Sequence, residues 1–390
     1  MTGLLALALL GTVALGSDPV ATLPMTEWNN LVIVPVSVET SSPFRLMLDT
    51  GMSLPGILLS KGPRVDALDL DFTEGPSVAG AGGDGGPLAT RHAHVSSITL
   101  GGLTISDVAV SILPDGQTMP ADIEGVIGFE LFQRYAVHVD RDRAVVALYE
   151  SATLEPASGS TTIPLVLRNG YPFVELMVAV SAKEAEEASK AELIVDLGAV
   201  YALWLNTDSQ GRFAPPAAAI ETSLGFGAGG RVEGHVGRSR LVRIGDLRLE
   251  NVVTLFPALH HQPPSRLDMR DGFIGADVLS RLDVTIDYPG KRLILRPSRV
   301  DTPFEWDMSG LLLNPGGDGG VVESISAGSP AEQAGLLAGD VLVAVDGKPI
   351  AELLGRGLRQ LLRRDGAEVR LTIKRGDETL EKRLTLRRLI

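Results

Sequence analysis

The stretch Phe44-Arg-Leu-Met-Leu-Asp49-Thr50-Gly51 decides the fold: an apolar run ends in a carboxylate, a small hydroxyl residue and a glycine. A second stretch, Ala191-Glu-Leu-Ile-Val-Asp196-Leu197-Gly198, has the same pattern in the other half of the chain. Short apolar runs bounded by turn residues are typical of buried β-strands. The sequence therefore predicts two buried strands, each ending in an aspartate.

Three further landmarks follow Asp49 and Asp196 at equal distances. A Gly-Ala-Gly-Gly segment begins 31 residues after each aspartate, a hydrophobic-Gly motif ends 79 residues after it, and another aspartate lies 91 residues after it. Four landmarks in register indicate an internal duplication, and the unit is too long for a solenoid repeat. The landmark residues are Gly80–Gly83 and Gly227–Gly230, Gly128 and Gly275, and Asp140 and Asp287.

A duplicated unit with one aspartate at a strand end predicts two lobes about a pseudo-twofold axis, each giving one carboxylate to a shared cleft. Two carboxylates in contact cannot both ionise cheaply, so they share one proton, as in the aspartic-protease dyad. Asp49 and Asp196 could then take a proton from water and give one to a carbonyl oxygen. This chemistry needs no cofactor and no metal.

With these motifs the chain resembles the aspartic peptidases, most closely their bacterial two-lobe, retropepsin-like members, over residues 30–298. The resemblance implies a mainly β fold in which two duplicated retropepsin-like β-barrel lobes, 28–155 and 156–298, form one bilobal protease unit. It implies that the catalytic pair cleaves protein or peptide substrates. It assigns Asp49 and Asp196 to catalysis, Thr50, Gly51, Leu197 and Gly198 to the active-site turns, and Gly82, Gly83, Gly229 and Gly230 to substrate-covering flaps.

Leu197 departs from the pattern of these peptidases. Thr50 can hydrogen-bond across to the opposite turn, but Leu197 cannot, and a missing buried hydrogen bond costs about 1 kcal/mol. Two functions therefore stay open: an active endopeptidase, and a bilobal peptide-binding scaffold that has lost catalysis. Met52 and Ala199 also replace hydroxyl donors of pepsin-like sites, which predicts raised pKa values and an optimum at weakly acidic to near-neutral pH.

The composition changes after Pro297. Ser329 is expected to cap a short helix that starts at Pro330, and Val341–Val345 to form a strand closed by an Asp346-Gly347 turn. Residues 301–390 resemble the small α+β PDZ domains of exported bacterial proteases.

That resemblance implies a peptide groove. The loop of Gly310, Leu311, Leu312 and Leu313 would bind a peptide's terminal carboxylate, and a helix over 351–362 would form the other wall. Because every landmark of the duplication precedes Pro297, we expect the lobes to catalyse cleavage without residues 301–390. The role expected for residues 301–390 is to recruit substrates.

Composition limits the remaining possibilities. The chain has 390 residues, a formal net charge of −13 and no cysteine. The negative charge disfavours binding to nucleic acids and to anionic membranes, and the absence of cysteine excludes disulfide bonds. The apolar run Leu4–Gly16 is too short to span a bilayer and predicts a signal peptide over 1–16, with export to the periplasm or beyond. A buried N-terminal strand or helix stays open, because no Lys or Arg precedes the run.

Some local patterns have plainer interpretations. The glycines of residues 80–86 could cradle a phosphate, but no Lys-Ser/Thr follows them, which favours a hairpin. The acidic insert Ser181–Lys190 predicts a surface helix. The histidines are interpreted as surface polar residues without a metal, and the tryptophans as packing residues; they are His92, His94, His260 and His261, and Trp28, Trp204 and Trp306.

Overall fold

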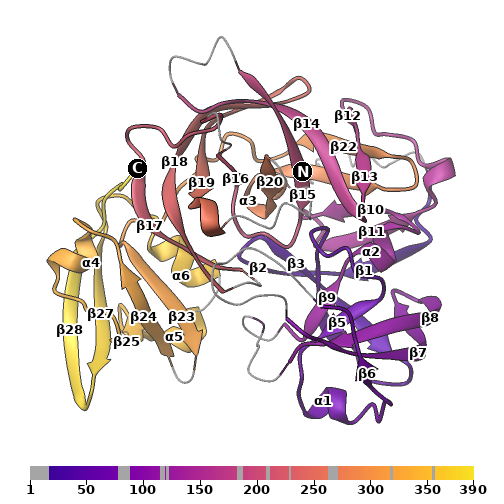
Figure 1. Ribbon diagram of the computed structural model, residues 1–390, viewed down its shortest axis with the longest axis horizontal. Coiled ribbons are helices and arrows are strands. Elements are labelled where there is room, and N and C mark those ends of the chain that lie inside the picture. Colours follow the sequence, from indigo (N-terminus) through magenta and orange to yellow (C-terminus); the bar gives the residue numbers. More distant parts are fainter. Residues whose placement is uncertain are drawn as a thin grey trace, which may run out of the picture.

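The computed structural model describes residues 17–77, 88–114, 119, 123–181, 188–207, 211–227, 230–261, 271–316, 319–353 and 356–390. These residues form four sheets: one in each lobe, one shared by the lobes and one in a C-terminal domain (Figure 1). The expected mainly β fold with two barrel lobes is confirmed. Among the described residues, no helix is long and apolar enough to cross a lipid bilayer. The expected signal peptide over 1–16 lies outside the described residues.

The first lobe is a closed barrel of six strands. Its sheet closes because the first strand pairs with the last, Ser37 with Thr99. In sheet order the strands are β3 (Leu31–Val38), β4 (Phe44–Leu48), β9 (Gly125–Ile127), β5 (Ile57–Leu59), β8 (Leu103–Ile112) and β7 (Arg91–Leu100), with β2 (Thr26–Trp28) and β6 (Thr73–Glu74) at the edges. A short helix, α1 (Pro63–Asp66), follows β5.

The second lobe repeats this barrel with the same strand order, as the duplication predicts. It closes where Val178 pairs with Val242. Its strands are β14 (Tyr171–Ala179), β15 (Ser189–Asp196), β20 (Gly272–Gly275), β16 (Leu203–Leu205), β19 (Leu247–Pro257) and β18 (Gly230–Ile244), with β13 (Val166–Arg168) and β17 (Ile220–Gly227) at the edges. The hydrophobic-Gly motif precedes an equivalent helix in both lobes, α2 (Phe129–Phe132) and α3 (Ala276–Leu279).

A six-stranded sheet joins the two lobes. Its centre is the antiparallel pairing of Val137–Val139 with Val284–Ile286, so the expected boundary between residues 155 and 156 is bridged by main-chain hydrogen bonds. In sheet order it contains β1 (Ala21–Pro24), β11 (Val145–Tyr149), β10 (Ala136–Asp140), β21 (Leu282–Asp287), β22 (Arg292–Pro297) and β12 (Thr161–Pro164). Strand β1 precedes residue 28, where the first lobe was expected to begin.

One apolar core runs through both lobes and the shared sheet. Trp204 is buried in it and stacks on Phe273 with ring centroids 4.9 Å apart, as expected for a packing residue. Trp306 packs against the same core from the segment that follows the lobes. A fully buried aliphatic or aromatic side chain stabilises a fold by roughly 1.5–3 kcal/mol, so this core fixes the lobes relative to each other.

The C-terminal domain is a smaller sheet with short helices. Ser329 Oγ accepts from the N–H of Glu332, and Asp346 and Gly347 have positive φ, as a tight hairpin turn requires. Its elements are β23 (Leu311–Gly316), β24 (Gly319–Ile325), α4 (Pro330–Gln333), β25 (Val341–Val345), β26 (Lys348–Pro349), α5 (Ile350–Leu353), α6 (Arg356–Leu361), β27 (Glu368–Arg375) and β28 (Glu378–Thr385).

Two expected helices are described only in part. Of the segment 351–362, residues 351–353 belong to the short helix α5 and residues 356–361 form α6, while residues 354 and 355 lie outside the described residues. In the acidic insert, Ser189 and Lys190 are paired in the β14–β15 ladder, which overrides their local helix propensity. Residues 182–187 lie outside the described residues.

Candidate active site

Parallel strand pairing places the two aspartates at equivalent positions. In the first lobe β4 runs parallel to β9, and the N–H of Asp49 continues the ladder to the carbonyl of Ile127 at 3.1 Å. In the second lobe β15 runs parallel to β20, and Asp196 pairs with Gly275. The carboxyl ends of parallel strands lie at one sheet edge, so both aspartates emerge where the lobes face each other.

Glycines make room for the two aspartate turns. A Cβ on Gly128 would lie 2.2 Å from the carbonyl oxygen of Asp49, and one on Gly275 would lie 2.3 Å from that of Tyr201. Real Cβ atoms do not approach backbone so closely. The hydrophobic-Gly motif of the sequence is therefore the surface on which each aspartate turn packs.

The turn glycines bring the opposite carboxyl groups together. A Cβ on Gly198 would lie 2.3 Å from Cγ of Asp49, and one on Gly51 would lie 2.7 Å from Oδ2 of Asp196. Each turn thus lies against the other lobe's aspartate. The two carboxyl groups share a hydrogen bond, so the structure brings together the pair that the duplication predicts.

Each carboxyl group also accepts from its own turn. The N–H of Gly51 donates to Oδ1 of Asp49 at 2.7 Å, and the N–H of Gly198 donates to Oδ1 of Asp196 at 2.8 Å. The backbone of Met52 and Ala199 supplies a second donor to each. Neither of these two side chains carries a hydroxyl, so these turn donors are main-chain groups.

The protein environment favours a proton on this pair. Burial raises the pKa of Asp49 above the ordinary aspartate value, although the N–H of Gly51 and other hydrogen bonds oppose the shift. Burial also raises the pKa of Asp196, and the neighbouring charge of Asp49 raises it further, well above its usual range. The two groups titrate as a coupled pair, which keeps one proton above the ordinary aspartate range.

A single threonine links the two turns. The buried hydroxyl of Thr50 donates to the carbonyl of Val195 at 2.6 Å and accepts from the N–H of Leu197 at 3.0 Å. The side chain of Leu197 is buried in the apolar core and offers no reciprocal hydroxyl. One hydroxyl thus makes two hydrogen bonds across the lobes.

Replacing this hydroxyl by a methyl group is expected to destabilise the lobes. Thr50→Val keeps the shape of the side chain but leaves the carbonyl of Val195 and the N–H of Leu197 buried without this partner, which costs about 2–4 kcal/mol. Urea unfolding measures the loss. The control is Thr104→Val, which removes an exposed hydroxyl and should change stability by less than about 0.5 kcal/mol. Equal effects of the two substitutions would contradict the role of Thr50.

Three tyrosines near the pair were not predicted from the sequence. Tyr171 hydrogen-bonds to Ser53, and both aspartates add to the burial that raises its pKa. Burial raises the pKa of Tyr201 to about 12. Tyr288 is buried, both aspartates raise its pKa after burial, and its hydroxyl has no partner among the described residues. None belongs to the Asp-x-Gly, Gly-Ala-Gly-Gly or hydrophobic-Gly motifs, so no sequence signal singled them out.

The predicted flaps are only partly described. Gly82, Gly83 and Gly229 lie outside the described residues. Gly230 pairs with Gly227 and begins β18, so the second glycine segment is the end of the β17–β18 hairpin. Thr222 on this hairpin hydrogen-bonds to Ser326 of the C-terminal domain, with the hydroxyl oxygens 2.8 Å apart.

The predicted carboxylate loop of the C-terminal domain already binds groups of its own. The N–H of Gly310 donates to Oδ1 of Asp307 at 2.8 Å, and that of Leu311 donates to Oγ of Ser309 at 3.1 Å. Leu312 and Leu313 lie on β23, an edge strand of the sheet. A peptide could extend this edge, but the N–H groups of Gly310 and Leu311 are already used.

The C-terminal domain touches the second aspartate turn directly. Both terminal nitrogens of Arg359 on α6 donate to the carbonyl of Val200, at 3.2 and 3.3 Å, four residues after Asp196. The N–H of Asp277 holds the adjacent carbonyl of Tyr201 at 3.1 Å, and its carboxylate faces Arg363 at 3.8 Å. The sequence suggested that the lobes work without residues 301–390, whereas this contact favours a supporting role of α6 at the turn, and truncation after Pro297 would distinguish the two.

The histidines do not form a metal site in the described part of the chain, where no group of three His, Asp or Glu side chains could hold an ion. His92 and His94 pack edge to face on β7. His261, expected at the surface, is instead buried at the end of a short 3-10 turn (Leu259–His261), where its Nδ1 accepts from the N–H of Glu233 at 2.8 Å.

Comparison with known proteins places two segments of the chain. Residues 34–131 match the family model described as aspartyl protease, and residues 321–375 match that of the PDZ domain. An aspartic proteinase from Irpex lacteus is 14% identical, with a TM-score of 0.47, over 72% of this chain and 98% of that chain. A search of curated proteins found no match. By these two family matches, the chain carries an aspartyl-protease-like segment in its first lobe and a PDZ domain in its C-terminal part.

Proposed function

We propose that this protein is an aspartic-type endopeptidase in which Asp49 and Asp196 activate a water molecule. The observation that carries the proposal is the contact of two buried carboxyl groups, one from each lobe, whose pKa values are both raised by burial. One can be ionised while the other keeps its proton. A base and an acid then face the same bond of a substrate that lies between the lobes.

The proton movements follow from this arrangement. The ionised carboxylate takes a proton from water as the water oxygen attacks the peptide carbonyl carbon. The protonated carboxyl group gives its proton to the carbonyl oxygen, which leaves a tetrahedral diol. In the second step the carboxyl group that now holds the proton gives it to the nitrogen of the leaving group as the C–N bond breaks. The other carboxylate takes a proton from a hydroxyl of the diol, so the pair returns to its single shared proton.

Thr50 favours the enzyme over the scaffold alternative. The case for lost catalysis is that Leu197 lacks a hydroxyl. The hydroxyl of Thr50 nevertheless makes hydrogen bonds to both Val195 and Leu197 of the opposite turn. Both carboxyl groups therefore have the support that a working pair needs.

Activity should peak at weakly acidic to near-neutral pH. Below the lower pKa of the pair both groups are protonated and no base is present; above the upper pKa both are ionised and no acid is present. Burial raises both pKa values, so both limits move upward from the strongly acidic range. The pH dependence of kcat/KM checks this, and a maximum in strong acid would contradict it.

Digestion of a peptide library tests the proposed reaction. The purified chain should cleave internal peptide bonds, and mass spectrometry should find new termini without added metal or cofactor. The Asp49→Asn chain, purified in parallel, should give none of these termini. If the folded wild-type chain cleaved nothing across pH 4–8, the scaffold alternative would replace this proposal.

The PDZ domain and the N-terminal run extend the proposal to partners and location. We infer that the edge strand β23 recruits peptide or protein C-termini, because strand addition is the usual PDZ binding mode.

We also propose that the protein is exported, and the apolar run Leu4–Gly16 supports this. N-terminal sequencing of the secreted chain would test export, and an N-terminus at Met1 would contradict it.

A further inference from the structure

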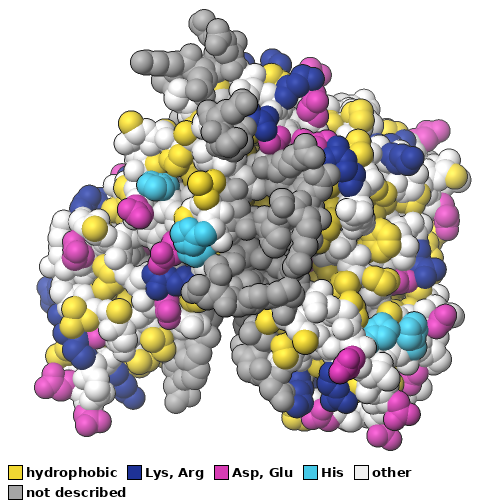
Figure 2. Space-filling model, in the orientation of Figure 1, with side chains coloured by type: hydrophobic (Ala, Val, Ile, Leu, Met, Phe, Trp, Pro, Cys, Tyr) yellow, Lys and Arg dark blue, Asp and Glu magenta, His cyan; other side chains and the backbone are white. Residues whose placement is uncertain are grey.

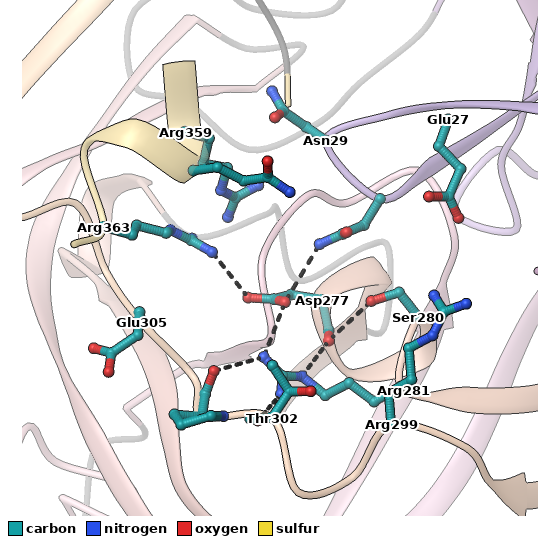
Figure 3. A pocket seen from close by; sticks show the side chains of 13 residues that line it. Glu27, Asn29, Asp277, Ser280, Arg281, Arg299, Thr302, Glu305, Arg359 and Arg363 are labelled. Atoms are coloured by element: carbon teal, nitrogen blue, oxygen red, sulfur yellow. Dashed lines mark hydrogen bonds and ion pairs between the residues drawn. The ribbon is translucent and has the colours of Figure 1, made fainter. Parts of the chain in front are cut away.

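A cavity of about 280 Å³ lies where both lobes meet the PDZ domain. Asn29 and Asn30 of the first lobe, residues around Asp277 of the second and helix α6 of the PDZ domain surround it (Figure 3). Arg299 and Gln360 at its wall are exposed, so the cavity is open to solvent. It is separate from the aspartate pair and belongs to no step of the proposed reaction.

Arginine dominates the cavity wall. Four arginines line it, namely Arg281, Arg299, Arg359 and Arg363, together with the acids Glu27, Asp277 and Glu305. Figure 3 shows these side chains arranged around Asp277.

Most of the acids are neutralised from outside the cavity. Glu27 binds Arg141, and Glu305 binds Arg238 and Arg388, none of which lines the wall. Arg299 likewise pairs with Asp142 on the surface. Within the cavity, Arg281, Arg359 and Arg363 thus face the single carboxylate of Asp277.

The carboxylate of Asp277 is already engaged by one of these arginines. Arg281 reaches its Oδ1 at 3.4 Å, and Asn30 donates to the same oxygen at 3.3 Å. Arg281 also binds two main-chain carbonyls of the segment 302–303. Two guanidinium groups, those of Arg359 and Arg363, are left without a full counter-charge.

Arg363 carries the unmet hydrogen-bonding capacity. It lies 3.8 Å from Oδ2 of Asp277, beyond hydrogen-bond range, and its buried Nε has no partner among the described residues. Arg359 donates from each of its two terminal nitrogens to the carbonyl of Val200, which uses two of its five N–H groups. Burial, together with the charge of Arg359, lowers the pKa of Arg363 to about 10. The negative charge of Asp307 raises the pKa of both arginines and partly opposes the effect of burial. Asp307 does not line the cavity, however, and its Oδ1 accepts hydrogen bonds from Ser309 and Gly310.

The size and charge of the cavity define its ligand. Pockets for drug-sized molecules measure roughly 300–1,000 Å³, so this one suits a smaller group. Guanidinium forks bind carboxylates and phosphates with two parallel hydrogen bonds. A phosphate-type dianion would supply roughly two negative charges to the two uncompensated arginines. We propose that this cavity binds a small dianion of the inorganic phosphate class, held by Arg363 and Arg359 at the junction of the PDZ domain and the lobes.

Binding of inorganic phosphate to the full-length chain tests this site without relying on catalysis. Isothermal titration at constant ionic strength should give one phosphate per chain, and sulfate should compete with it. Acetate, a monoanion, should bind at least tenfold more weakly. Arg363→Gln should raise the dissociation constant of phosphate at least tenfold. The control Arg383→Gln, which removes an exposed arginine on β28 that does not line the cavity, should leave it unchanged.

A second variant protects the test against misfolding. Gln360→Glu adds a negative charge to an exposed side chain of the wall and should weaken phosphate at least threefold while the circular dichroism spectrum stays that of the wild type. Loss of binding in Arg363→Gln and Gln360→Glu, but not in Arg383→Gln, supports the site. Unchanged affinity in Arg363→Gln and Gln360→Glu, or wild-type binding no stronger than that of chloride, would overturn it.

Discussion

Replacing either Asp49 or Asp196 by asparagine is expected to lower kcat/KM for peptide cleavage by about 10³-fold or more. A positioned acid or base contributes roughly 10²–10⁴-fold to a rate, and a lone carboxyl group cannot serve as both. The two groups act as a unit, so we expect the double substitution to cost little more than either single one. Initial rates on one library-derived peptide give all three values.

The fold should survive these substitutions. A raised pKa means that the ionised carboxyl group is disfavoured in the folded state, so its stabilising contribution is present at low pH and is lost as pH rises through the folded pKa. Asparagine at position 196 is always neutral, so the variant should be at least as stable as the wild type near pH 7. Asp107→Asn, an exposed carboxylate with φ of 54° that asparagine tolerates, is the matched control and should keep full activity. Wild-type turnover by Asp196→Asn would require another site.

Truncation after Pro297 is expected to slow cleavage of a short generic peptide at least tenfold. The sequence alone suggested little effect, because both aspartates precede this residue. The structure changes the expectation, since Arg359 holds the carbonyl of Val200 beside the second aspartate turn. The truncation also removes Phe304, which is buried in the core of the lobes.

Point variants separate support of the turn from recruitment of substrate. Arg359→Met should lower kcat on the short peptide, in the direction of the truncation, and leave affinity for a PDZ-binding peptide unchanged. Arg383→Gln, an exposed arginine on β28, is the control and should change neither. If truncation slowed only protein substrates with apolar C-termini, recruitment would be the main role of the domain and the contact with Val200 would be incidental.

The fold and the aspartate pair could be predicted because the duplication repeats them in the chain. The motif around Asp49 recurs around Asp196, and Gly128 and Gly275 keep the same spacing because each must admit a turn of the backbone. Each of these motifs involves residues that are close in sequence, and each occurs once in either half of the chain. They indicate which strands are buried and where the carboxyl groups emerge.

What the sequence did not predict depends on contacts between distant residues. The hydrogen bond from Arg359 to Val200 spans 159 residues, and nothing near either residue signals the other. The Nδ1 of His261 accepts from the N–H of Glu233, 28 residues earlier, and no motif in the sequence signals this contact. The N–H of Gly310 in the groove loop is likewise used by Asp307, three residues earlier.

Figure 2 shows hydrophobic, basic and acidic side chains interspersed over the visible face of the described residues. The aspartate pair and the arginine-lined cavity are therefore the two sites on which experiments should concentrate.

The central claim is that Asp49 and Asp196 share one proton, and a carboxyl titration tests it most directly. The chain labelled with ¹³C at the aspartate carboxyl carbons can be followed by NMR across pH, with the two signals assigned from the Asp49→Asn and Asp196→Asn variants. We expect Asp196 in the wild type to keep its proton well above the ordinary aspartate pKa of 3.8, and its pKa to fall in Asp49→Asn, where the neighbouring charge is gone. An Asp196 that titrates near 3.8 in the wild type, or unchanged in Asp49→Asn, would contradict the account.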